Sequence, residues 1–335
     1  MPQDCAEAGA LPEIEGLEAY WRHHGMRERR AADADMWMAD KIMLDALGLG
    51  LEQTHAFLGR AAPGYDEFRR WILATAGPPD AERIARYHAW LSGAPPPPRT
   101  RERLLAVEAA PDVLGSEEME GWARDGFVIL RAAIAPDEAA AAAQALWDHL
   151  GAVPDDPESW YAPSSHGIMV QLFQHPALEP ARRSARIHKA FAQLWGTADL
   201  WSTTDRMSFN PPETPRHRFR GPHLHWDVSL VRPIPFATQA ILYLTDTEAD
   251  QGALTLVPGF HRRIEAWLEA LPPGADPRRQ DLNGGARAIA AGAADLLIWR
   301  NALPHGASPN RSAKPRMAHY VNMYAPTLKR QRVWR

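Results

Sequence analysis

Two histidines and one aspartate in the second half of the chain have the residue types and spacing of a metal-binding set. His225 and Asp227 are two residues apart, and side chains at i and i+2 on a β-strand point to the same face. His305 follows the apolar segment 295–299 and can approach from another strand. Two imidazoles and one carboxylate on one face are typical of non-haem Fe(II) sites with open coordination positions. A His-x-Asp pair alone is common, so the prediction rests on all three residues together.

An arginine eleven residues after His305 could bind a carboxylate. Arg316 is expected at the start of the next strand, and a guanidinium can hold a carboxylate through two parallel hydrogen bonds. A keto acid such as 2-oxoglutarate needs this contact at its far end when its other end chelates iron. A surface ion pair is the alternative interpretation of Arg316.

The residues that would position these side chains form short apolar segments after residue 200. Such segments occur at 241–244, 254–257, 295–299 and 317–324, separated by turns rich in glycine and proline. This pattern predicts an all-β sandwich or barrel. A strand at 127–130 and helices at about 136–150 and 178–195 precede it.

The first hundred residues have a different pattern. Apolar residues at steps of three and four between residues 17 and 92 predict three to five amphipathic helices. Four consecutive prolines at 95–98 favour an extended spacer. We therefore expect a helical N-terminal domain over residues 1–105 and a second domain over residues 116–335.

Four motifs taken together resemble the phytanoyl-CoA dioxygenase family of Fe(II)/2-oxoglutarate oxygenases. The resemblance covers residues 116–325. The motifs are Trp-x-x-Asp-Gly-Phe-Val from residue 122, the His-x-Asp pair at 225, Gly-Ala-Leu…Pro-Gly-x-His at 252–261, and His-Gly…Pro-Asn-Arg-Ser…Arg at 305–316.

The resemblance implies a mainly β fold with helices: a double-stranded β-helix, or jelly roll, with flanking helices, preceded here by the all-helical N-terminal domain. It implies iron ligation by His225, Asp227 and His305, and 2-oxoglutarate binding by Arg316. Many members have serine two residues after the distal histidine, where this chain has Ala307 with Ser308 beside it. Ser308 and Asn210 are further cosubstrate candidates.

The implied activity is that of an oxidoreductase that uses Fe(II), 2-oxoglutarate and O2 to hydroxylate an unactivated C–H bond of a small molecule. Related halogenases have glycine or alanine in place of the carboxylate ligand, so Asp227 favours hydroxylation. Desaturation or cyclisation at the same iron is an alternative, as is a carrier-tethered or CoA-linked substrate. We expect a role in bacterial specialised metabolism. A non-catalytic jelly-roll binding or scaffold protein is the alternative from another class.

Several other residues are candidates for substrate contact. They are Trp160, His166, Gln171, Trp226 and Arg218. Trp226 lies between two ligands and would point away from them, so core packing is its more common role. The basic run that contains Arg218 is commonly a solvated loop. His223 is an alternative ligand, and we expect His261 to be structural.

Composition limits the remaining classes. With 37 basic and 41 acidic residues the formal net charge is −4, which disfavours a general nucleic-acid partner. No apolar run reaches the length of about 18 residues that a membrane-spanning helix requires, and the first residues do not resemble a secretory signal. Cys5 is the single cysteine, so a cytoplasmic location is expected. The partners we expect are a small-molecule substrate and, at the N-terminal helices, a carrier protein.

Overall fold

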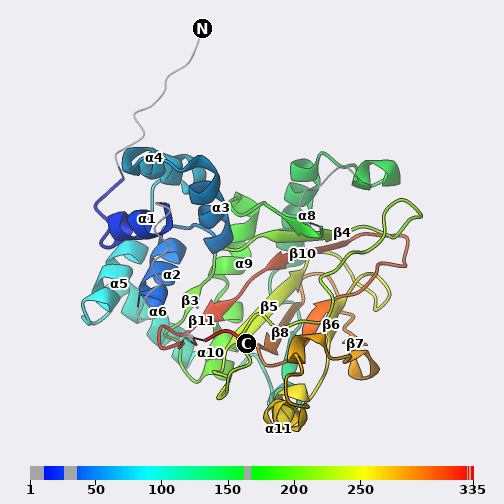
Figure 1. Ribbon diagram of the computed structural model, residues 1–335. Helices are drawn as coiled ribbons and strands as arrows, with labels where there is room; N and C mark the ends of the chain where they lie inside the picture. Colours follow the sequence, from blue (N-terminus) through cyan, green and yellow to red (C-terminus); the bar gives the residue numbers. More distant parts are fainter. Residues whose placement is uncertain (1–10, 26–35, 162–166, 330, 332) are drawn as a thin grey trace.

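The computed structural model describes residues 11–25, 36–161, 167–329, 331 and 333–335. Within them, helices occupy the N-terminal third, and antiparallel sheets occupy much of the C-terminal half (Figure 1). The mixed helical and β character that the sequence predicts is therefore confirmed. No helix among these residues is long and apolar enough to cross a membrane.

Among the described residues, six helices form the N-terminal region, drawn in blue and cyan in Figure 1. They are α1 (Leu17–Gly25), α2 (Trp37–Ala46), α3 (Leu51–Ala61), α4 (Tyr65–Ala76), α5 (Ala81–Leu91) and α6 (Pro98–Ala109). Five of them lie between residues 17 and 92, where the sequence predicts three to five. Their apolar faces meet in one buried cluster that includes Tyr20, Ile42, Phe68, Ile72 and Tyr87.

Helices α5 and α6 lie on either side of the proline run. The Asp80 carboxylate accepts hydrogen bonds from the first backbone N–H groups of α5, which is the usual N-cap contact. Residues 95–97 belong to no helix, but Pro98 is the first residue of α6, a position where proline loses no helical hydrogen bond. Helix α6 continues to Ala109, beyond the boundary expected at residue 105.

The largest sheet has six antiparallel strands in the order β1-β8-β5-β10-β4-β2. The strands are β1 (Phe127–Leu130), β2 (Met169–Val170), β4 (Met207–Asn210), β5 (Thr238–Tyr243), β8 (Leu296–Arg300) and β10 (Arg316–Tyr320). The order places strands that are distant in the chain side by side, so the sheet depends on contacts that no local pattern specifies.

A three-stranded sheet packs against one face of the large sheet. Its strands, in the order β7-β6-β9, are β6 (Leu254–Leu256), β7 (Arg287–Ala288) and β9 (His305–Ala307). Ile241, Tyr243 and Trp299 from the large sheet share a buried cluster with Leu254 and Leu256 from the small one. The molecule therefore contains a two-sheet sandwich with a filled interior.

Helices cover the opposite face of the large sheet. They are α7 (Ser116–Asp125), α8 (Pro136–Leu150), α9 (Glu179–Arg183) and α10 (Ala185–Trp195). Leu146 of α8 and Phe191 of α10 share a cluster with Leu242, Ile298 and Met317 of the sheet. Leu242 lies between two residues of the sandwich interior, as strand alternation requires.

The remaining elements are short. They are β3 (Trp201–Ser202) paired with β11 (Met323–Tyr324), α11 (Ile264–Ala270), and the 3₁₀ turns η1 (Pro157–Tyr161), η2 (Pro176–Leu178), η3 (Phe260–Arg262), η4 (Pro277–Arg279) and η5 (Asn283–Gly285). Strands β3 and β11 connect the sandwich to the N-terminal helices, because Trp201 and Tyr324 belong to the buried cluster of those helices.

One buried carboxylate joins the helical region to the rest of the chain. Asp45 in α2 accepts the backbone N–H of Thr204 at 2.9 Å and the hydroxyl of Tyr324 at 2.7 Å. Its side chain is 5% exposed, and Lys41 contacts it from one turn earlier. Burial raises the pKa of Tyr324 well above its usual range, and the negative charge of Asp45 is the second cause.

Candidate metal centre

His225 and His305 are direct neighbours across the small sheet. Each backbone N–H donates to the other's carbonyl oxygen, at 2.9 and 3.0 Å. The pair is an isolated antiparallel bridge, so His225 does not lie on a regular strand, which corrects the sequence-based expectation. A bridge is nevertheless sufficient, because residues directly opposite in an antiparallel pair place their side chains on one face. The two imidazole centroids are 4.5 Å apart.

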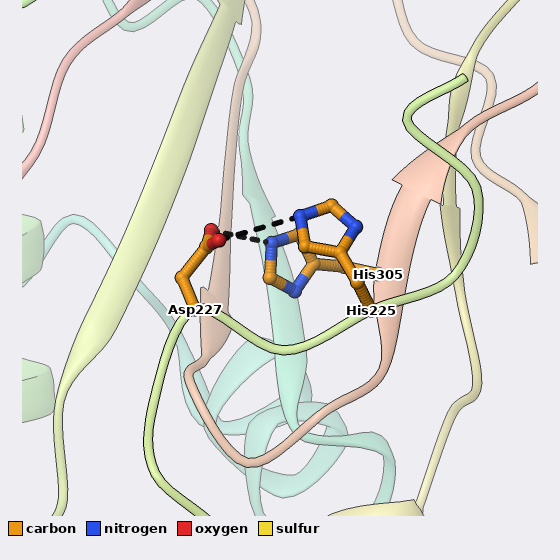
Figure 2. Close-up of side chains that lie close together, drawn as sticks. All are labelled: His225, Asp227 and His305. Carbon is orange, nitrogen blue, oxygen red and sulfur yellow. Dashed lines mark hydrogen bonds and ion pairs between the residues drawn. The ribbon is translucent and has the colours of Figure 1, made fainter. Parts of the chain in front are cut away.

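The Asp227 carboxylate faces both imidazoles (Figure 2). Its Oδ1 lies 3.4 Å from Nε2 of His225, and its Oδ2 lies 3.1 Å from Nε2 of His305. One ligand atom from each of the three residues lies within 4.8 Å of the others. Asp227 is 56% exposed and His305 only 6%, so the group opens to solvent on the carboxylate side.

The other ring nitrogen of each histidine bonds to the backbone. Nδ1 of His225 lies 2.7 Å from the carbonyl oxygen of His223, and Nδ1 of His305 lies 3.2 Å from that of Leu303. A carbonyl only accepts, so Nδ1 carries a proton and Nε2 is the ring nitrogen that faces the shared point. There Nε2 contacts the Asp227 carboxylate, and it would present its lone pair to a bound metal ion. Metal-binding histidines usually have this arrangement. The donor set therefore fits a non-haem iron ion.

Mutual contacts shift the charge states of the group. Burial raises the pKa of Asp227, but hydrogen bonds from His225 and His305 outweigh it and hold the pKa well below its usual range. Burial lowers the pKa of His225, but the hydrogen bond with Asp227 and the carbonyl of His223 outweigh it, so the pKa is raised. Asp227 is thus an anion across the physiological range.

Two residues that the sequence analysis did not single out hold the segment around Asp227. Gln239 on β5 donates from Nε2 to Oδ2 of Asp227 at 2.7 Å. Arg278 donates to the carbonyl oxygens of Trp226 and Val228, both at 2.7 Å. The backbone is thus held on both sides of the carboxylate. The only signal for Gln239 in the sequence is one amide side chain on an otherwise apolar strand.

Arg316 lies at the start of β10 and is 1% exposed. It is two residues from Ala318, which belongs to the interior of the sandwich, so strand alternation points Arg316 to that interior. One Nη donates to the Ser208 hydroxyl at 2.8 Å, and Nε is buried with no hydrogen-bond partner. No carboxylate of the described chain lies within 4.0 Å of it. A buried cation in this state is suited to an anionic ligand.

The two further cosubstrate candidates contact the backbone. The Asn210 amide donates to the carbonyl oxygen of Ser308 at 3.1 Å and, at 3.4 Å, to that of Gly252. The Ser308 hydroxyl donates to the carbonyl oxygen of Ala253 at 3.2 Å. Gly252 allows the close approach, because a Cβ there would meet the Asn210 amide at 2.2 Å.

The candidates for substrate contact differ in how far they are buried. Trp226 is 3% exposed, donates to the carbonyl oxygen of Ala302 and packs on Phe260 and Trp267. Trp160 is 9% exposed and packs against Trp147. These two indoles pack in the core, the more common role expected for Trp226, and substrate contact by either residue stays a prediction.

The other substrate candidates lie outside the core. Gln171 and Arg218 are exposed, and His166 lies outside the described residues. His223 is exposed and contributes its carbonyl to His225. His261 contacts the carbonyl oxygen of Ala123 and lies against Gly126, where a Cβ would meet its ring at 2.4 Å. The structural role expected for His261 agrees with these contacts.

Comparison with known proteins identifies the class. Residues 122–318 match the sequence model of the phytanoyl-CoA dioxygenase (PhyH) family. The match covers more than half of the chain, which therefore belongs to this family of Fe(II)/2-oxoglutarate-dependent oxygenases. The resemblance derived from the four motifs is confirmed.

Individual relatives are distant. The ectoine dioxygenase of Bordetella parapertussis is 25% identical over 177 residues, which are 48% of this chain and 54% of that protein. The match thus spans about half the length of this curated relative. Among solved structures, AviO1 from Streptomyces viridochromogenes is 19% identical with a TM-score of 0.47, over 65% of this chain and 98% of that one. Iron-bound EctD from S. alaskensis is 19% identical with a TM-score of 0.45, over 66% and 81%.

Proposed function

We propose that this protein is a 2-oxoglutarate-dependent dioxygenase that hydroxylates a C–H bond of a small molecule. The observation that carries the proposal is the convergence of His225, Asp227 and His305. Their two Nε2 atoms and one carboxylate meet at a single point, and both Nδ1 atoms are occupied by carbonyl groups. Family membership supports the same activity.

In this proposal His225, Asp227 and His305 hold Fe(II). Bound there, iron would supply the oxidising chemistry, which couples O2 reduction to decarboxylation of 2-oxoglutarate. The chain's own contribution is positional. Gln239 orients the carboxylate of Asp227, and the two carbonyl groups fix the imidazole rings. The Trp299 ring, 5.3 Å from that of His305, excludes water behind the group.

Arg316 binds the far carboxylate of 2-oxoglutarate. Its guanidinium is buried in the sandwich interior without a carboxylate partner in the described chain, so pairing with an anion recovers part of the cost of its burial. Ser308 and Asn210 act next to it, either on the cosubstrate or by holding the loop whose carbonyl groups they contact.

We also propose a fold type, a location and a substrate class. The two-sheet sandwich would be the double-stranded β-helix of the family. Residues 1–105 would be an added helical domain, and the protein would be cytoplasmic. Gln171 and Arg218, both exposed, are retained as substrate candidates. The substrate is a small molecule of specialised metabolism, free or linked to CoA or a carrier. Desaturation or cyclisation would use the same residues.

An anaerobic titration tests the proposal. Fe(II) and 2-oxoglutarate are added to metal-free protein, and the visible charge-transfer band of the iron–keto acid chelate is recorded. We expect the band in the wild type, its weakening in Asp227→Ala, and a higher 2-oxoglutarate requirement in Arg316→Lys, which keeps the charge but loses the planar fork.

Arg311→Gln is the matched control, because Arg311 is an exposed arginine of the loop that precedes β10. It should leave the band unchanged. Folded wild-type protein without a band would contradict the oxygenase proposal and favour the binding or scaffold alternative.

A further inference from the structure

A cavity lies at the junction of the N-terminal helices and the sandwich. Its volume is about 350 Å³, and none of His225, Asp227, His305 or Arg316 lines it. Its walls come from α5, α6, α9, the beginning of α10, and β3. It is therefore separate from the metal centre, and the helical region completes it.

Five arginines line this cavity against three carboxylates. The arginines are Arg83, Arg86, Arg103, Arg182 and Arg183, and the carboxylates are Asp80, Glu82 and Glu179. The arginines come from three different helices, so they surround the cavity instead of forming one stripe. The imbalance favours an anion inside it.

The carboxylates of the cavity already have other partners. Asp80 caps the first turn of α5, and Glu82 accepts the backbone N–H and the hydroxyl of Thr100 at 2.8 and 2.7 Å. Glu179 pairs with Arg182 and Arg183. Two of the three acids are therefore engaged with groups other than the arginines.

Two guanidinium groups have no carboxylate partner within 4.0 Å in the described chain. Arg83 donates one hydrogen bond, to the carbonyl oxygen of Asp45 at 2.6 Å. Arg103, which is exposed, makes no hydrogen bond or ion pair with the described residues. Partial desolvation, and second the positive charge of Arg83, lower the pKa of Arg103. Arg83 and Arg103 are thus neighbouring positive charges without a direct ion pair.

A buried donor and a helix terminus add to this field. The Arg182 side chain is 8% exposed, and its Nε is buried without an acceptor among the described residues. Ser184 and Ala185, at the N-cap and first residue of the eleven-residue helix α10, also line the cavity. Helix N-termini favour anions because their first N–H groups have no helical partner.

Three apolar side chains also line the cavity: Val107, Trp201 and Met323. The Arg86 guanidinium lies 4.1 Å from the centre of the Trp201 ring. A ligand that fits both the arginines and this apolar lining combines an anionic head with a small organic body. A phosphate monoester carries a charge of about −1.5 to −2 near pH 7, which matches the excess of arginines over carboxylates in the lining of the cavity.

We infer that this cavity is a second ligand site, which binds the phosphate group of a small phosphorylated organic molecule. Arg83 and Arg103 contact the phosphate oxygens, and the apolar side chains of the lining pack against the organic part. Because α5 and α6 supply one part of the site and α9, α10 and β3 supply the rest, bound ligand stabilises the junction between the helical region and the sandwich.

The test is a calorimetric titration of metal-free full-length protein saturated with 2-oxoglutarate, so that Arg316 is occupied. Phenyl phosphate, inorganic phosphate and benzoate are the three probes. We expect phenyl phosphate to bind one to one and most tightly, inorganic phosphate more weakly, and benzoate weakest. If inorganic phosphate binds as tightly as phenyl phosphate, the site is reassigned to free phosphate. If benzoate binds as tightly as phenyl phosphate, phosphate recognition is contradicted.

Variants locate the binding. Arg103→Gln should weaken phenyl phosphate about tenfold or more and abolish the rise in melting temperature that the ligand causes. Arg103→Lys should recover part of both. Arg101→Gln, an exposed arginine of the same helix outside the cavity, should change neither. Absence of binding in the wild type, or equal binding in Arg103→Gln and Arg101→Gln, would overturn the inference.

Discussion

Arg316 and Asp227 carry opposite charges in different environments. Arg316 is 1% exposed and has no carboxylate partner in the described chain, whereas Asp227 is 56% exposed and contacts two histidines. Burial of a cation without a counter-ion is costly, so Arg316 needs an anionic ligand. Asp227 already has favourable contacts, which a metal ion would replace. In the proposed function, cosubstrate and metal would therefore depend on separate residues.

Gln239 offers a prediction at this scale. Gln239→Met keeps the length of the side chain but removes the hydrogen bond to Asp227. The carboxylate loses its fixed orientation, and Fe(II) affinity should fall about tenfold to a hundredfold, as for other residues that orient metal ligands. A competition titration against a chromogenic chelator measures the affinity.

Gln144→Met is the matched control, since Gln144 is exposed on α8 and far from the site in sequence. Unchanged iron affinity in Gln239→Met would mean that the bonds of Arg278 alone hold the Asp227 segment.

The residues of the candidate site could be predicted from the sequence, but the residues that hold them in place could not. His225, Asp227, His305 and Arg316 have characteristic types and spacing. Gln239 contacts Asp227 only because β5 lies beside the segment that carries it, which is a tertiary relation. The burial of Trp226 in the core likewise depends on tertiary contacts.

At the scale of elements, strand β10 carries functional and structural residues on alternate faces. Arg316 and Ala318 point to the sandwich interior, whereas Met317 and His319 point to the covering helices. His319 is fully buried, and both ring nitrogens lack partners among the described residues. Burial first, and then the charge of Arg182, hold the pKa of His319 well below its usual range.

This histidine makes stability depend on pH. Below about pH 6.5 the unfolded chain binds a proton at His319, whereas the folded chain does not. The free energy of unfolding therefore falls as the pH falls. The loss reaches about 1.4 kcal/mol per pH unit. His319→Met should therefore show a shallower decline between pH 6.5 and pH 5 in urea unfolding.

His149→Gln, at the end of α8, should keep the wild-type slope. The part of the slope that persists in His319→Met belongs to groups such as His188, whose pKa is also lowered, chiefly by burial. Identical slopes in wild type and His319→Met would show that His319 accepts a proton in the folded state.

Elements with local signals could be predicted well, and those formed by distant pairing could not. The helix at 136–150 has proline at its start and glycine after its end, which are local signals. The segment at His225 forms an isolated bridge with His305, eighty residues later in the chain, and no local pattern specifies such a pairing. The proline run predicts a spacer, yet its last residue begins α6, since proline suits the first helical turn.

At the scale of the whole molecule, the helical region and the sandwich share buried groups. Trp201 and Tyr324 from the sandwich belong to the core of the helical region, and Arg86 donates to Asp199 and to the carbonyl oxygen of Leu200. A junction of this kind, with buried polar contacts, differs from the flexible linkage typical of separate domains. It predicts that the two parts unfold together.

Asp45→Ala tests this coupling. The variant leaves the Thr204 N–H and the Tyr324 hydroxyl buried without their acceptor, so the free energy of unfolding should fall by about 3 kcal/mol. Far-ultraviolet circular dichroism, dominated by the helices, and tryptophan fluorescence should shift together in urea. Asp155→Ala, an exposed aspartate, should shift neither. Separate transitions, with helices lost first, would instead favour the independent N-terminal domain that the proline run predicts.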